Sequence, residues 1–165
     1  MRALLALAML AWLTSQSAVM AANDSQAERV SLTGLTTISV VVEDLAPIAE
    51  QHGLTRAALQ TDVERRLRQA KVSVTPDADA YLYVHVTVAD PGGSSPLPYV
   101  VELTFMQEVT LPRGLRTRTP LQCPTWWLNR LGLVSPNVLR TAVSDRVGEF
   151  VDQFIRAYQA VNPKP

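Results

Sequence analysis

YLYVHVTV, at residues 81–88, alternates without a break between aliphatic side chains and polar or aromatic ones. A second stretch, YVVELTFMQEVTL at residues 99–111, repeats the alternation. This period of two is typical of a strand with one buried and one solvated face. The connecting residues 91–96, PGGSSP, have the composition of a loop. The two stretches therefore predict an antiparallel hairpin whose aliphatic side belongs to a core.

The alternation also predicts which side chains meet on the other side of this hairpin. The aliphatic sides of both strands must share one sheet face, because a slip of one residue would expose them. His85 then faces Glu102 or Thr104, and Tyr83 faces Thr104 or Met106. Gln107 interrupts the aliphatic side, so a β-bulge is expected near residues 106–107.

A third strand is expected after the turn Pro112-Arg113-Gly114. Counting outward from this turn places Arg116 opposite Thr110 and Arg118 opposite Glu108. Both arginines would then lie on the polar face of the sheet. Shorter strands are predicted at residues 36–43 and 72–74, where β-branched residues gather.

Two helices are predicted, at about residues 55–70 and 136–161. In the first, Leu59, Val63 and Leu67 form an apolar stripe behind the N-cap residue Thr55. The second opens at Ser135-Pro136 and carries a longer stripe. Gly148 in its middle costs about 1 kcal/mol relative to alanine, which predicts a close approach to the sheet or to the first helix.

These elements predict an α+β fold, a two-layer sandwich with a mostly antiparallel sheet of 4–5 strands and two helices on one face. Residues 36–163 would form a single domain, and residues 22–35 a flexible N-terminal segment. Residues 1–21 are typical of a signal peptide, with a basic start, an 11-residue apolar run and small residues before a cleavage site near Ala21. The expected location is the periplasm, or outside the cell.

Composition argues against several partners and cofactors. The chain has 15 basic and 15 acidic residues, so no net charge attracts nucleic acid or an anionic membrane. The apolar run near the N-terminus is too short to span a membrane, no other stretch approaches that length, and no cysteine near Ala21 could carry a lipid anchor. One cysteine and two histidines form no recognisable metal set, and no phosphate-binding loop occurs, so we expect no cofactor.

Catalysis has two weak candidates. His85 could act as a general base beside Glu102, although a plain cross-strand polar contact is the commoner role of such a pair. Cys123 could act as a nucleophile, although a buried thiol is the commoner role of a lone cysteine. The adjacent Trp126-Trp127 pair is consistent with core packing or with an aromatic binding surface.

Two segments resemble a set of small exported bacterial proteins of uncharacterised function. They are Asp62-Val63-Glu64-Arg65-Arg66-Leu67-Arg68-Gln69-Ala70 with Tyr81-Leu82-Tyr83-Val84, and Val151-Asp152-Gln153-Phe154-Ile155 with Val161-Asn162-Pro163. The resemblance covers most of residues 36–163. The element order is also similar to small α+β modules of envelope proteins, such as the N-terminal domain of the Tol-system β-propeller protein. This likeness implies a fold, and it brings no active-site residues.

The expected function is that of a non-enzymatic envelope domain that binds a protein partner or assembles with itself. The polar face mixes tyrosine, methionine and arginine, a composition that interfaces favour. The alternative is a small ligand-binding protein or hydrolase with a pocket near Cys123 and His85. The candidate partner surface comprises Tyr81, Tyr83, His85, Glu102, Met106, Glu108, Arg116, Arg118, Trp126 and Trp127.

Overall fold

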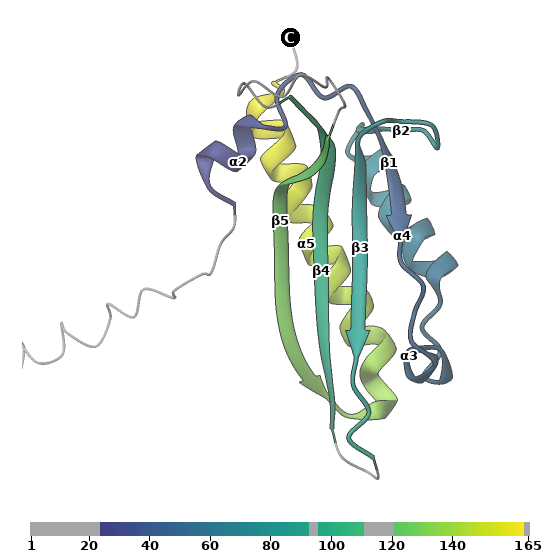
Figure 1. Ribbon diagram of the computed structural model, residues 1–165. Helices are drawn as coiled ribbons and strands as arrows, with labels where there is room; N and C mark the ends of the chain where they lie inside the picture. Colours follow the sequence, from purple (N-terminus) through teal and green to yellow (C-terminus); the bar gives the residue numbers. More distant parts are fainter. Residues whose placement is uncertain (1–23, 93–95, 111–120, 164–165) are drawn as a thin grey trace, which may run out of the picture.

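The fold is a single five-stranded sheet with two long helices on one face (Figure 1), as seen in a computed structural model that describes residues 24–92, 96–110 and 121–163. The helices are α2 (Gln26–Val30), α3 (Pro47–Gln51), α4 (Arg56–Gln69) and α5 (Leu139–Val161), with a 3₁₀ turn at Pro136–Val138. The strands are β1 (Thr37–Val42), β2 (Ser73–Val74), β3 (Tyr81–Val88), β4 (Leu97–Val109) and β5 (Leu121–Val134).

The sheet order is β2-β1-β3-β4-β5. The long ladders β3–β4 and β4–β5 are antiparallel, whereas β1 runs parallel to both β2 and β3. Helix α4 supplies the crossover that a parallel β1–β2 pair requires. The predicted two-layer α+β sandwich is therefore confirmed.

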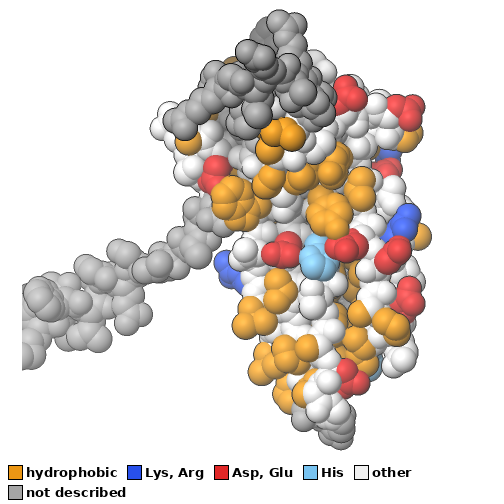
Figure 2. Space-filling model, viewed as in Figure 1, with side chains coloured by type: hydrophobic (Ala, Val, Ile, Leu, Met, Phe, Trp, Pro, Cys, Tyr) orange, Lys and Arg blue, Asp and Glu red, His pale blue; other side chains and the backbone are white. Residues whose placement is uncertain are grey.

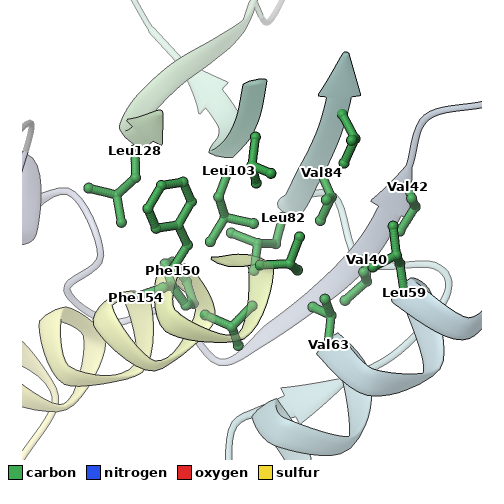
Figure 3. Packing of buried hydrophobic residues seen from close by; sticks show 14 of the residues in the cluster. Val40, Val42, Leu59, Val63, Leu82, Val84, Leu103, Leu128, Phe150 and Phe154 are labelled. Atoms are coloured by element: carbon green, nitrogen blue, oxygen red, sulfur yellow. The ribbon is translucent and has the colours of Figure 1, made fainter. Parts of the chain in front are cut away.

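The core lies between the sheet and the two helices α4 and α5. Leu82, Val84 and Leu103 project from the sheet toward the helices, where Val63 and Phe154 meet them (Figure 3). All five side chains are fully buried. The apolar stripes and the strand alternation thus meet at one interface, which is the main hydrophobic contribution to stability.

The helix starts agree with the sequence signals in part. The Thr55 hydroxyl accepts a hydrogen bond of 3.2 Å from the amide of Ala58, as expected of an N-cap. Pro136 occupies the first position of the 3₁₀ turn, but the side chain of Ser135 makes no capping hydrogen bond. Helix α5 itself begins only at Leu139, where the turn continues into α-helix.

Gly148 marks the close approach of α5 to α4. A Cβ atom at this position would lie 2.7 Å from a guanidinium nitrogen of Arg66. That guanidinium is held by Asp62 of its own helix at 2.8 Å and by Asp152 of α5 at 3.3 Å. The glycine therefore makes room for an ion-pair network between the two helices.

The register of β5 corrects the sequence prediction for the third strand. Glu108 pairs with Gln122, and not with Arg118. Counting from Pro112-Arg113-Gly114 placed the partner of Glu108 too early in the sequence, because a turn motif alone does not fix which residues of two long strands pair. Arg116 and Arg118 lie outside the described residues.

The predicted β-bulge is present, with its extra residue in β5. Phe105 pairs with Trp126 and Met106 with Pro124, so that Thr125 is left over between them. The Gln107 amide donates to the Thr125 hydroxyl at 2.9 Å and thereby secures the bulge. The bulge shifts the parity of β5, and this shift turns Trp126 toward the core.

The N-terminal part corrects a second prediction. From Asp24 onward, residues expected to be flexible form α2, whose start carries a capping box between Ser25 and Glu28. Leu32, just after this helix, is fully buried. Burial of the apolar Leu32 side chain holds this segment against the core. The predicted signal peptide, residues 1–21, lies outside the described residues.

Within the described ranges, we find no helix that combines the length and the apolar character needed to cross a bilayer.

Candidate functional site

The side of the sheet turned away from α4 and α5, which we call the open face, carries the candidate surface (Figures 1 and 2). Along β3, Leu82 and Val84 are fully buried, whereas Tyr81, Tyr83 and His85 are partly exposed. Pairing registers order the open face into rows that run across the strands. Neighbours in a row are Cα partners, so their side chains stand next to each other.

Two of these rows form a hollow of about 610 Å³, which we call the aromatic trough. One row is Tyr83, Thr104 and Trp127, and the other is Tyr81, Met106 and Pro124. The trough runs along β4: its floor comes from β4, and its walls rise from β3 and β5. Two strand spacings separate these walls, which places them about 10 Å apart.

A row of ionisable side chains, which we call the carboxylate belt, lies next to one end of the trough. His85 Nδ1 lies 2.9 Å from Glu102 Oε2, and His85 Nε2 lies 3.5 Å from Glu43 Oε2. Figure 2 shows the belt as pale blue between two red groups, with hydrophobic side chains on both sides of it. The register settles the open sequence alternative, because His85 pairs with Glu102 and Tyr83 with Thr104.

Glu43 ties the belt to the trough. The Tyr83 hydroxyl donates a 2.5 Å hydrogen bond to Glu43 Oε2. This bond, together with partial burial and the nearby negative charges of Glu43 and Glu102, raises the pKa of Tyr83 to about 12. The tyrosine therefore stays neutral at all physiological pH values.

On the other side of the belt lies a second apolar area, the leucine patch, formed by Leu131 and Leu133 of β5. These side chains are 70% and 66% exposed. Val100 of β4 pairs with Leu131 and extends the patch inward. Because β5 is the edge strand of the sheet, the patch lies where a partner can reach it from the face or from the side.

The tandem tryptophans point to opposite sides of the sheet. Trp127 is 36% exposed and stands in the trough wall, whereas Trp126 is fully buried. Trp126 packs edge-on against Phe154 with ring centroids 5.3 Å apart. It therefore does not belong to the candidate partner surface, because the bulge at Thr125 has turned its ring into the core.

Trp126 also anchors the N-terminal segment. Its indole nitrogen donates to Asp24 at 3.0 Å, and Arg29 binds the same carboxylate at 2.7 and 2.8 Å. Burial raises the pKa of Asp24, but hydrogen bonds from Arg29 and Trp126 outweigh this effect and leave the pKa lowered overall. The charged aspartate is thus the form that holds the segment in place.

The structure places the remaining candidate residues apart from the trough. Glu108 is exposed near the far end of β4, opposite Gln122. Cys123 is partly buried opposite Gln107 and does not line the trough, and neither does His85. The described residues contain no group of three or more side chains suited to hold a metal ion.

Sequence reasoning missed three kinds of residue on the open face. Glu43 belongs to the belt because β1 runs parallel to β3, a pairing that its sequence did not indicate. Pro124 was missed because the predicted register of the third strand was wrong, and the leucine patch because this strand was not followed as far as Val134. The alternation of Leu131 with Leu133 was the available signal.

Comparisons with known proteins place the chain in no family. No family model matches it, and the search of curated proteins found no match. One solved structure with a related arrangement is a dodecamer of PelC from Paraburkholderia phytofirmans, with 10% identity over 75% of this chain and 87% of that chain and a TM-score of 0.43. Another is the hypothetical protein CT253 from Chlamydia trachomatis, with 9% identity over 73% of this chain and 98% of that chain and a TM-score of 0.38. Likeness at this level assigns no function to this chain.

Proposed function

We propose that this chain is an exported, non-enzymatic domain of the cell envelope that binds a protein partner through the open face of its sheet. The observation that carries the proposal is the exposure of Trp127, Leu131 and Leu133 along one strand of that face. Export is inferred from residues 1–21, whose composition is that of a signal peptide.

The distribution of exposed apolar side chains supports this role. Seven large hydrophobic side chains are exposed among the described residues, and four of them stand on the open face. These four are Val41, Trp127, Leu131 and Leu133. Full burial of one leucine against a partner contributes about 1.5–3 kcal/mol, so the leucine patch alone could add substantially to binding. Tryptophan and tyrosine are also the residues that most often dominate interfaces.

The experiment that tests the proposal is photocrosslinking in cells. Benzoylphenylalanine is introduced at Thr104 or Leu131 on the open face, and at Arg68 or Glu149, which are exposed on α4 and α5, as matched controls. We expect a discrete adduct from the open-face positions only, and its mass shows whether it contains another protein or a second copy. Equal adducts from the helix positions, or none from any position, would rule out the proposal.

A second candidate function, hydrolysis, is favoured by one specific arrangement. The Thr87 hydroxyl lies 3.2 Å from His85 Nε2, and His85 Nδ1 lies 2.9 Å from Glu102. This order of hydroxyl, imidazole and carboxylate is the one that activates a nucleophile in hydrolytic triads. If the chain were a hydrolase, an activated ester or a fluorophosphonate would label Thr87 in the wild type, and the Thr87→Ala variant would remain unlabelled. No labelling above the variant would exclude this candidate.

A further inference from the structure

The open face is acidic as well as apolar. Its described residues include Glu43 and Glu102 in the belt and Glu108 near the end of β4, and they include no lysine or arginine. The single imidazole of His85 lies between the two belt carboxylates and can neutralise at most one of them. Acidic groups therefore outnumber basic ones at the belt end of the aromatic trough.

Aromatic walls beside carboxylates have a specific chemical preference. The faces of tyrosine and tryptophan rings attract cations, and neighbouring carboxylates add direct ion pairing. Phosphate groups would be repelled by the belt, and a neutral ligand would gain nothing from it. The charge of the site thus selects a cationic occupant with apolar flanks.

We infer that the aromatic trough binds an extended segment of a partner protein that carries an arginine at the belt end. This inference rests on the proposed function, because it names the chemistry of the partner on the same face. Arginine fits better than lysine, since its planar guanidinium stacks on rings and forms paired hydrogen bonds with a carboxylate. The width of about 10 Å between the walls accommodates one extended chain with its side chains.

The geometry also predicts the order of apolar and basic residues in the bound segment. Apolar residues would lie over Thr104 and Met106, between Tyr83 and Trp127. The guanidinium would lie over the next row of β4, where Glu102 projects. Successive open-face rows lie about 7 Å apart along a strand, so the arginine and its apolar neighbour are two residues apart or adjacent in the partner.

The experiment is an NMR titration of ¹⁵N-labelled protein, purified after export, with a defined probe. The probe is the peptide acetyl-Pro-Leu-Arg-Pro-amide, and the control peptide replaces its arginine with citrulline, which has the same shape and no charge. We expect millimolar binding of the arginine peptide, with shifts at Tyr83, Thr104 and the indole of Trp127. The citrulline peptide should bind at least about fivefold more weakly.

Three variants separate the parts of the site. Glu102→Gln keeps the shape of the belt, and it should weaken the arginine peptide severalfold while leaving the citrulline peptide unchanged. Trp127→Ala removes a wall of the trough and should weaken both peptides. Glu149→Gln is the matched control, because it makes the same change of charge on α5, away from the open face, and it should change neither affinity.

Three outcomes would overturn the inference. Equal affinity for the two peptides would show that charge plays no part, and absence of binding would show that the trough is not a peptide site. Shifts at Tyr83 and Trp127 that depend on protein concentration without any peptide would assign the trough to a second copy of the chain. In each case the crosslinking at Leu131 would still decide the proposed function, so the two failures remain distinguishable.

Discussion

The two faces of the sheet differ in both burial and chemistry. On β3, Leu82 and Val84 are fully buried beneath the helices, whereas Tyr83 and His85, one residue away, stand on the open face. The buried face is satisfied by α4 and α5. The open face combines an aromatic trough, two carboxylates and exposed leucines, with nothing else from the described residues laid across them. The difference shows that alternate residues of each strand are specified by packing in the core, whereas the residues between them are available for recognition.

The largest expected effect concerns the buried face. Phe105→Ala should lower the free energy of unfolding by about 3–5 kcal/mol, because it leaves a cavity beside Phe154. Met106→Ala, the next residue along β4 but on the open face, should cost less than about 1 kcal/mol. Urea denaturation of both variants measures the contrast. Equal losses of unfolding free energy in the two variants would contradict the distinction between the two faces.

The second effect concerns the contacts that hold the N-terminal segment against the buried face. Asp24→Asn should lower the free energy of unfolding by about 1.5–3 kcal/mol at pH 7, because it weakens charged hydrogen bonds to Arg29 and Trp126. The pKa of Asp24 is lowered by folding, so its stabilisation is present above the unfolded value of 3.8 and is lost as the pH falls through the folded value. Denaturation at pH 7 and at pH 2 measures this. A difference between wild type and variant that persists unchanged at pH 2 would contradict the role of the charge.

The third effect compares two glycines on the core side. Gly132→Ala should destabilise the protein by about 1–3 kcal/mol, because its Cβ would lie 2.3 Å from the ring of the buried Tyr99. Gly148→Ala meets only the end of the Arg66 side chain, and its gain in helix propensity offsets the displacement, so its net change should stay within about 1 kcal/mol. Thermal unfolding of both variants measures this difference in stability. A larger loss from Gly148→Ala would mean that the ion pairs of Arg66 are more rigid than the aromatic ring.

The smallest expected effect belongs to the open face. Leu131→Ser should change the free energy of unfolding by no more than about 0.5 kcal/mol, because the side chain is already exposed. The same variant should reduce crosslinking from Thr104 if the leucine patch contributes to binding. A folded variant with undiminished crosslinking would confine the interface to the trough.

Much of this architecture could be predicted from local patterns. The alternation in β3 and β4 determined which residues face the core, and the stripes of Leu59 and Val143 placed the helices. Gln107 indicated the bulge because a polar side chain at a core position needs a partner, which Ser31 and Thr125 provide. These features depend on residues close together in the sequence.

What could not be predicted depends on pairing between distant segments. The parallel β1–β3 pairing, which brings Glu43 to His85, joins strands that are separated in the chain by α3, α4 and β2, and it has no local signature. The predicted register of β5 was wrong, with Gln122 rather than Arg118 opposite Glu108, because a turn motif alone does not fix which residues of two long strands pair. The burial of Trp126 was missed for another reason: the bulge at Thr125 changes which tryptophan faces the core.

The most direct test of the central claim is thiol footprinting of the open face in cells and in purified protein. Single cysteines are placed at His85, Thr104 and Asn129 in a Cys123→Ser background, with Arg68 and Glu149 on the helices as references. If a partner covers the open face, the three positions react readily in the purified protein and slowly in intact cells, while the references react alike in both. Equal reactivity of the open-face positions in the two settings would contradict the claim.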